Sequence, residues 1–191
     1  MSLISVRSDL RGAARDVKKM QGVIQKAATS SINRATSQAR TAGVRKVRER
    51  YEIRAKEVNA TFSVRKATSN GLAAILKSKT QGGLPLIKFK TAPKSPMAPN
   101  QPRGGVKATV LKGQKRTLKR AFVASVGSGG HIGVFERSTT RRLPIKELFG
   151  PPIPYMLNNP EVRDEIEQKF AESFESRFSH EVDRQLGKLV R

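Results

Sequence analysis

Two histidines are the only side chains in this 191-residue chain that ordinarily titrate near neutral pH, and neither stands in a catalytic pattern. With 2 His and 0 Cys, the sequence excludes a thiol nucleophile, a disulfide framework and a Cys-based zinc site, and it argues against a multi-histidine metal site. His131 lies in the run GSGGHIG, which leads into a predicted strand rather than a helix, so we interpret the run as a hairpin turn and not as a phosphate-binding loop. His180 lies beside Glu181 in an acidic stretch without a nucleophile. We therefore expect no enzymatic activity, no catalytic residue, no cofactor and no metal ion.

Positive charge is the strongest chemical signal in the sequence. Lysine and arginine number 38 against 15 acidic residues, which gives a formal net charge of +23. No acidic residue occurs between Glu57 and Glu136, whereas the segment from Glu161 onward holds 8 acids and 6 bases. A charge of this size implies a polyanionic partner, an acidic protein neighbour, or an assembly in which the charge is shared.

The densest basic run is VRKVRERYEIRAK, which we predict to form a helix from Val44 to about Ala55. Its candidate contacts to DNA or to an acidic partner are Arg45, Lys46, Arg48, Arg50 and Arg54. Two interpretations stay open at this point: contact with a phosphate backbone, which releases counterions, and charge matching with a protein. Sequence-specific reading of DNA is not expected, because no helix-turn-helix pattern, zinc finger or ribonucleoprotein aromatic motif occurs.

The segment Arg141–Pro154, RRLPIKELFGPPIP, combines prolines that stiffen the backbone with apolar side chains that so short a piece cannot bury alone. Its candidate protein-docking residues are Leu143, Pro144, Ile145, Lys146, Glu147, Leu148, Phe149, Gly150 and Pro151. Docking to a partner and clamping within the chain are equally compatible with this composition.

Hydrophobic periodicity predicts an α+β fold, with basic N-terminal helices, a small antiparallel β-sheet and a long C-terminal helix packed on the sheet. Apolar residues recur at steps of three and four from Asp9 to Thr41, and Gly43 is expected to end that helix. A short helical piece over Lys56–Ala60 follows the basic run. The expected strands are Leu72–Thr80, Leu84–Phe89, Val106–Gly113, Arg120–Val126 and Ile132–Glu136.

The last element is predicted as a helix over Pro160–Val190, with Asn159 as N-cap. Its phenylalanine stripe, Phe170, Phe174 and Phe178, is expected to pack in the core. The expected organisation is one folded domain. Its regions are a basic helical region 1–70, an antiparallel β region 71–136 with a proline-rich arm 91–105, a docking loop 137–159 and a C-terminal helix 160–191.

The stretch VFERSTTRRLPIKELFGPPIP, Val134–Pro154, resembles the phage and prophage minor tail protein Z family, also called tail completion proteins. Members carry a similar LPIKELFGPSIP-like stretch after a Gly-bearing strand, and they open with basic helices of the type seen here at Ala42–Glu57. The resemblance covers most of the chain and offers no catalytic residue.

The resemblance implies a structural virion protein of the head–tail joint that finishes the tail and helps to attach it to the DNA-filled head. Implied partners are the tail terminator, the tail tube or the head–tail connector, and a homo-oligomeric ring, for which six copies are preferred. Non-specific contact with packaged DNA is compatible with the charge, and no membrane partner is expected. The implied location is the virion tail or neck, assembled in the host cytoplasm.

A second hypothesis comes from the charge alone. It is a non-specific nucleic-acid-binding protein that acts outside a virion. Such a protein would stay small and bind DNA with a steep dependence on salt, whereas a neck protein would form rings or bind a tail tube.

Overall fold

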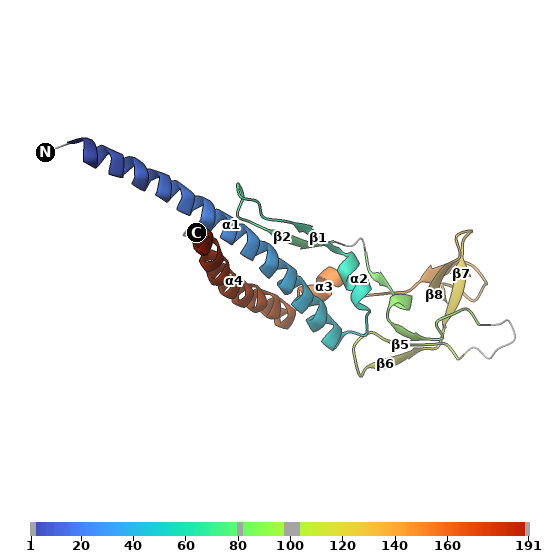
Figure 1. Ribbon diagram of the computed structural model, residues 1–191. Helices are drawn as coiled ribbons and strands as arrows, with labels where there is room; N and C mark the ends of the chain where they lie inside the picture. Colours follow the sequence, from blue (N-terminus) through green and yellow to red (C-terminus); the bar gives the residue numbers. More distant parts are fainter. Residues whose placement is uncertain (1–2, 80–81, 98–103, 190–191) are drawn as a thin grey trace. The chain divides into compact units, whose positions relative to one another are not determined.

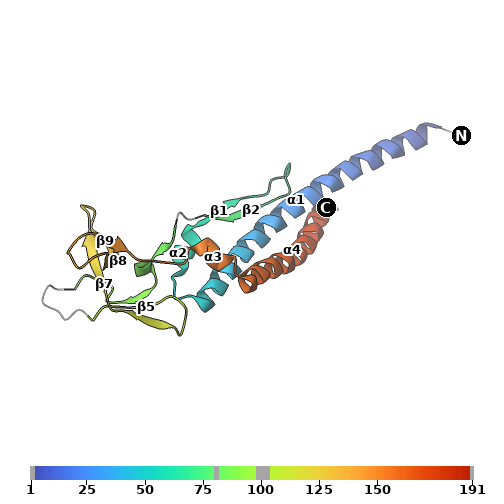
Figure 2. The ribbon, with the colours of Figure 1, turned by 180° about the vertical axis from the view of Figure 1, so that it is seen from behind.

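The computed structural model describes the backbone of residues 3–79, 82–97 and 104–189, and the side chains of 17–79, 82–97 and 104–187. Its elements follow the expected order, so the α+β fold class is confirmed. The long helices are α1 (Leu3–Arg50) and α4 (Pro160–Leu189), and the short ones are α2 (Ala55–Ala60) and α3 (Ile153–Leu157). In the sequence between α1 and α4 lie the strands of small antiparallel sheets (Figures 1 and 2).

The chain divides into two compact units. The first contains the part of α1 up to Thr41, residues Val64–Leu76, and α4 from Ile166 onward. The second contains Ala42–Ser63 and Lys77–Glu165.

Helix α1 does not end at Gly43, where the sequence led us to expect a break, but continues to Arg50. A glycine inside a helix costs about 1 kcal/mol relative to alanine. Gly43 is buried, and so are Val44, directly after it, and Val47, one turn further along the helix. Burial of this face outweighs the local propensity of a single glycine, so the two predicted helices are one.

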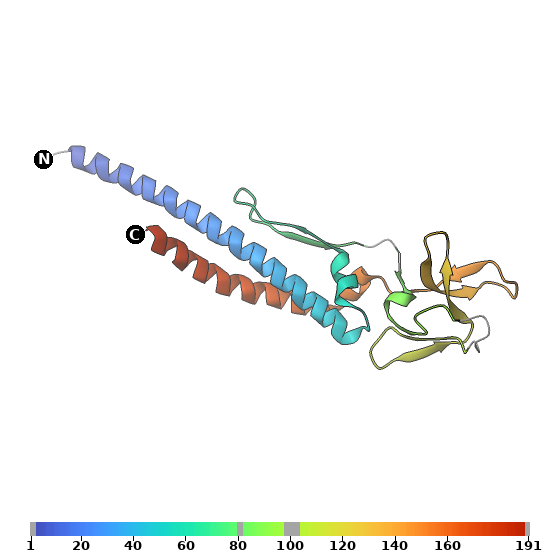
Figure 3. The same ribbon diagram turned by 45° about the vertical axis from the view of Figure 1, so that its right-hand side comes forward.

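In the first unit, α4 runs alongside α1 (Figures 1 and 3). The side of α1 that is buried here consists of small residues, among them Ala27, Ser31 and Ala35. The buried Ser173 of α4 donates a hydrogen bond to Gln38 Oε1 of α1. The long C-terminal helix was expected to pack on the sheet; within this unit it runs along α1 and is joined to it by the Ser173–Gln38 hydrogen bond.

The phenylalanine stripe of α4 is half-buried, and its rings stack on one another. The ring centroids of Phe170 and Phe174 lie 6.2 Å apart, and those of Phe174 and Phe178 lie 5.5 Å apart. The Asn159 cap is as predicted, since its Oδ1 accepts a hydrogen bond of 3.1 Å from the Glu161 amide.

Asn33 of α1 fixes a connecting segment of the first unit. Its side-chain amide donates to the carbonyl oxygen of Ala67 at 3.0 Å, and its Oδ1 accepts from the amide of Ala67 at 2.8 Å. This reciprocal pair satisfies both backbone groups of a buried residue outside a strand or helix.

Four separate antiparallel sheets replace the single sheet in the sequence-based picture, in the orders β1-β2, β10-β3, β4-β5-β6 and β7-β8-β9. The strands are β1 (Phe62–Arg65), β2 (Ile75–Ser78), β3 (Leu84–Pro85), β4 (Lys90–Ala92), β5 (Val106–Thr109), β6 (Lys115–Leu118), β7 (Ala121–Val126), β8 (His131–Arg137), β9 (Ile145–Glu147) and β10 (Phe149–Gly150). A 3₁₀ turn, η1 (Leu86–Lys88), follows β3.

Alternation along the strands follows the predicted faces. Val106 and Ala108 of β5 are buried while Lys107 between them is exposed, and Val123 of β7 pairs with the buried Val134 of β8. The turn between β7 and β8 is Gly127–Gly130, as predicted for the GSGGHIG run, and the last three residues of that run begin β8.

Two segments expected to be irregular contain strands. The region 137–159 holds β9, β10 and α3 rather than an uninterrupted loop, because each of its short extended pieces pairs with a strand from elsewhere in the chain. The proline-rich arm begins inside β4, where Thr91 pairs with Ala108. Residues 98–103 of that arm lie outside the described residues.

Candidate protein-docking groove

The proline-rich segment Arg141–Pro154 is held in the second unit by backbone hydrogen bonds at Leu148. The amide of Leu148 donates to Val134 of β8 at 2.8 Å, and its carbonyl oxygen accepts from the Leu86 amide at 2.9 Å. Leu148 therefore connects β9 to β10. Its side chain is half-buried, so part of it packs inside the chain and part of it is exposed. Phe149, directly after it, is 54% exposed.

Gly150 allows this segment to lie against the aromatic ring of Phe89. A Cβ atom at position 150 would lie 2.6 Å from Cε2 and 2.9 Å from Cζ of that ring. Phe89 is only 3% exposed and is paired with Ile53. The glycine of the LFGP motif is thus required by packing, which supports the internal-clamp interpretation for this one position.

Behind Phe149 the surface is hollowed into an apolar groove of about 580 Å³. Its lining residues are Arg50, Tyr51, Leu86, Ala108, Val110, Leu111, Gln114, Arg116, Leu118, Leu148, Phe149, Gly150, Pro151 and Tyr155. Three of the lining residues, Tyr51, Leu86 and Ala108, are buried, so packing within the chain holds them in place. Tyr155 of α3, which also lines the groove, is 68% exposed.

Backbone hydrogen bonds bring the end of α1 to this groove. The amide of Lys112 donates to the Arg50 carbonyl at 2.9 Å, and the amide of Glu52 donates to the Val110 carbonyl at 2.9 Å. Arg50 thereby becomes a lining residue, together with Arg116 of β6. No lining residue is acidic, so the groove combines apolar walls with positive charge.

Of the nine residues predicted for docking, the structure brings four into the groove: Leu148, Phe149, Gly150 and Pro151. Leu143 and Pro144 are exposed outside it, and Ile145, Lys146 and Glu147 form β9. Sequence reasoning missed Tyr155 and Arg116. An aromatic residue directly after the run PPIP was a signal for Tyr155, whereas Arg116 had none, because the expected strands did not include β6.

The basic cluster is largely paired with carboxylates of its own chain. Arg45 lies 3.7 Å from Glu49 and 4.0 Å from Glu165, and Lys46 lies 3.4 Å from Glu49. Exposed pairs of this kind contribute little stability, yet each places a carboxylate beside the cation.

Two further members of the cluster also have carboxylate neighbours. Arg50 lies 3.9 Å from Glu161, and Arg54 lies 3.0 Å from Glu57. Arg48 is exposed on α1 between these pairs. The structure therefore divides the predicted contact set into four residues with an intramolecular carboxylate and Arg48.

The described residues include one histidine–carboxylate pair. His131 Nε2 lies 3.0 Å from Glu147 Oε1 across the β7-β8-β9 sheet. Within the described part of the chain, no group of three or more His, Cys, Asp or Glu side chains could hold a metal ion. Among the same residues, no helix is both long enough and apolar enough to cross a membrane.

On α4, the guanidinium of Arg184 donates hydrogen bonds to the Glu181 carboxylate, and the amide of Gln185 adds another at 2.9 Å. These bonds, foremost those from Arg184, lower the pKa of Glu181 to about 2.

Residues 9–191 match the family described as prophage minor tail protein Z (GPZ), which is nearly the whole chain and includes both the groove and the basic helix. No curated protein and no solved structure shows significant similarity to this chain. This chain belongs to the prophage minor tail protein Z family and is a structural protein of a phage tail.

Proposed function

We propose that this protein acts at the head–tail joint, where it finishes the tail and helps to attach it to the DNA-filled head. In this proposal it forms a homo-oligomeric ring of six copies, is assembled in the host cytoplasm, and ends in the neck of the virion. The observation that supports this proposal is the apolar groove, in which two exposed aromatic side chains lie among buried residues and arginines. Aromatic residues and arginine are the residue types that dominate binding energy at protein interfaces.

The groove is the proposed docking site for a neighbouring tail or neck protein, that is, the tail terminator, the tail tube or the head–tail connector. Phe149 and Tyr155 are 54% and 68% exposed, so each retains apolar area that a partner can bury. Full burial of one such side chain contributes about 1.5–3 kcal/mol. The partner's matching surface should carry apolar side chains beside carboxylates, because the charged lining residues are arginines.

Complementation of a phage that lacks this gene tests the proposal. The double variant Phe149→Ser and Tyr155→Ser should fold like the wild type, because both side chains are exposed, but should give a low infectious titre. Electron micrographs should then show DNA-filled heads and unjoined tails. The matched control replaces two exposed apolar residues of the β7–β8 hairpin, Val126→Ser and Ile132→Ser, and should keep the titre. A normal titre with the groove variant would exclude the groove as the docking site.

The exposed positive charge of this protein supports contact with an acidic partner or with packaged DNA at the head–tail joint. Strands β5 and β6 expose Lys107, Lys115 and Arg116 within the acid-free stretch, and Arg48 is exposed on α1. Reversal of Arg45 would place a carboxylate near Glu49 and Glu165, so its effect would combine repulsion within the chain with the loss of a partner contact.

Arg48→Glu is the cleaner reversal. We expect a folded chain and complete tails that do not join heads if this arginine meets DNA or the head, and unfinished tails if it meets the protein ring. Infectious particles at normal yield would show that the basic helix is only a solvated face.

A further inference from the structure

One row of residues on α1 is buried in the first unit and then becomes exposed toward the amino terminus. Ala27, Ser31 and Ala35 form the buried part of the row. At the same helical steps of three and four, the row continues as Ile24, Met20 and Val17, which are 48%, 50% and 57% exposed. A row of apolar side chains on one helix face is ordinarily covered by a neighbour.

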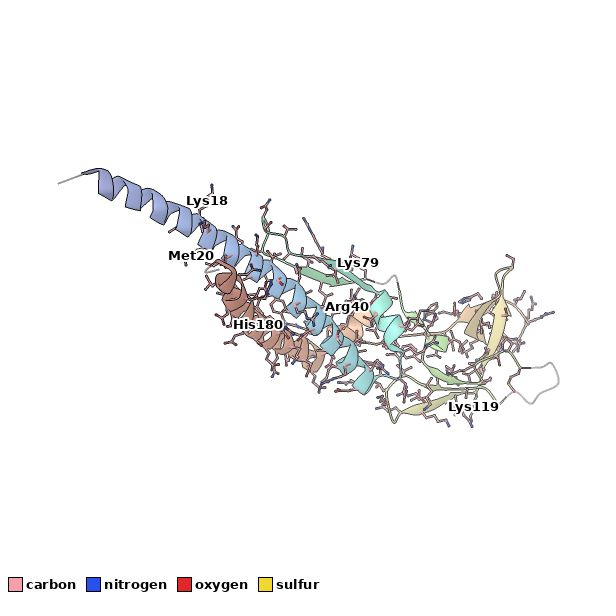
Figure 4. All side chains as sticks on the ribbon, in the orientation of Figure 1. Lys18, Met20, Arg40, Lys79, Lys119 and His180 are labelled. Atoms are coloured by element: carbon pink, nitrogen blue, oxygen red, sulfur yellow. The ribbon has the colours of Figure 1, made fainter. Side chains whose placement is uncertain are left out.

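The change occurs where α4 ends. Ser173 of α4 is bonded to Gln38 of α1, and the two helices run in opposite directions (Figures 1 and 3). Leu189 lies 16 residues after Ser173, and an equal step back from Gln38 along α1 reaches Gly22. Residues of α1 before Gly22 therefore extend past the described end of α4. Figure 4 shows Met20 on the side of α1 along which α4 runs, and Lys18 on another side.

The arm of α1, defined here as Leu3–Ile24, thus carries among its described side chains, Val17–Ile24, an apolar row that is continuous with the α1–α4 interface, and most of the arm lies beyond the described end of α4. An isolated helix of about 20 residues is marginally stable in water, and most helices in proteins owe their stability to tertiary packing. A partner for the exposed row would supply that packing.

Charge indicates what kind of partner fits. The sequence of the arm carries five bases and two acids, so two arms would repel each other. From Ile166 to Leu189, α4 carries five acids and four bases, and Glu172, Glu175 and Asp183 are exposed. The same helix offers apolar surface at Leu186, which is 37% exposed, and along the half-buried phenylalanine stripe.

We propose that the arm of one copy packs on α4 of a second copy of this chain. The contact is head-to-tail, because the arm and α4 are different surfaces, and such contacts close into a ring when the rotation between copies permits it. This inference rests on the proposed function for the ring, and it names the surface through which the copies of that ring meet.

Sedimentation equilibrium of the purified full chain tests the apolar part of the contact. The wild type should self-associate, and the triple variant Val17→Ala, Met20→Ala and Ile24→Ala should have a dissociation constant at least tenfold higher. Alanine is the best helix former, so the triple variant should keep the helical circular dichroism of the wild type. The matched control Gln25→Ala changes an exposed position off the row and should associate like the wild type.

Charge reversal tests the head-to-tail arrangement. Lys18→Glu with Lys19→Glu should weaken association, and so should Glu175→Lys with Asp183→Lys. Mixing these two variants should restore association, because each contact between a first and a second variant again joins opposite charges: a native arm meets a native α4, and a reversed arm meets a reversed α4. A mixture that stays monomeric would contradict the arrangement.

Two results of sedimentation equilibrium would overturn the inference. The wild type could stay monomeric at every protein concentration tested, or the triple variant could associate like the wild type. The proposed function fails separately. A monomeric wild type that still restores infectious phage refutes the arm contact alone. A chain that associates through the arm but never restores tails refutes the function alone.

Discussion

Substitution of Gly150 by alanine gives the sharpest test of how the docking segment is built. The added methyl group would lie 2.6 Å and 2.9 Å from two ring atoms of Phe89, well inside van der Waals contact. The ring has little room to move, because Phe89 is 3% exposed and its amide is bonded to Leu86 at 3.1 Å. Overpacking of a tight core costs about 1–3 kcal/mol, and for a chain of this length each kcal/mol lowers the melting temperature by about 2–4 °C.

We therefore expect Gly150→Ala to lower the melting temperature by about 2–12 °C in scanning calorimetry. The matched control is Gly187→Ala, where a Cβ would meet no atom within 4 Å and where the helix should gain about 0.5–1 kcal/mol. Combining Gly150→Ala with Phe89→Leu should cost less than the sum of the two single changes, because the leucine leaves space for the methyl group. A Gly150→Ala protein that melts like the wild type would refute close packing between the motif and the Phe89 ring.

Three further outcomes follow from other contacts. Asn33→Ala should lower the unfolding free energy by about 1–3 kcal/mol in urea titrations, since it leaves the buried amide and carbonyl of Ala67 without their partners; no change would show that water replaces the side chain. Because the folded-state pKa of Glu181 is lowered to about 2, its pair with Arg184 should stabilise the protein above pH 4.5 and lose that effect as the pH falls toward 2. Glu181→Gln should remove this pH dependence, which solvent screening limits to about 0.5 kcal/mol, while an unchanged pH profile would contradict the pairing. Cleavage by trypsin at Lys94 should be fast in the free subunit and slow in the assembly, and equal rates would show that the arm needs no neighbour for protection.

Local sequence signals were sufficient wherever one segment decides its own structure. The C-terminal helix begins at Pro160 behind its Asn159 cap, because a cap needs only residues within one turn. Alternation in Val106–Thr109 revealed which side chains face the core, since a strand with one buried face must alternate. The stretch Val134–Pro154, together with the basic helices before it, indicated the family that nearly the whole chain matches.

Tertiary structure decided every feature that joins distant segments. Burial of Val44 and Val47 carries α1 through Gly43 against its local propensity. The pairing of Arg45 with Glu165 connects residues far apart in the chain, so no local pattern could reveal that the basic cluster is partly neutralised. The groove joins the end of α1 to β6, β10 and α3, and its shape exists only once strand pairing has brought these elements together. Sequence therefore determined which residues carry apolar surface and charge, and the fold determined which of them share one surface, because that depends on contacts between elements far apart in the sequence.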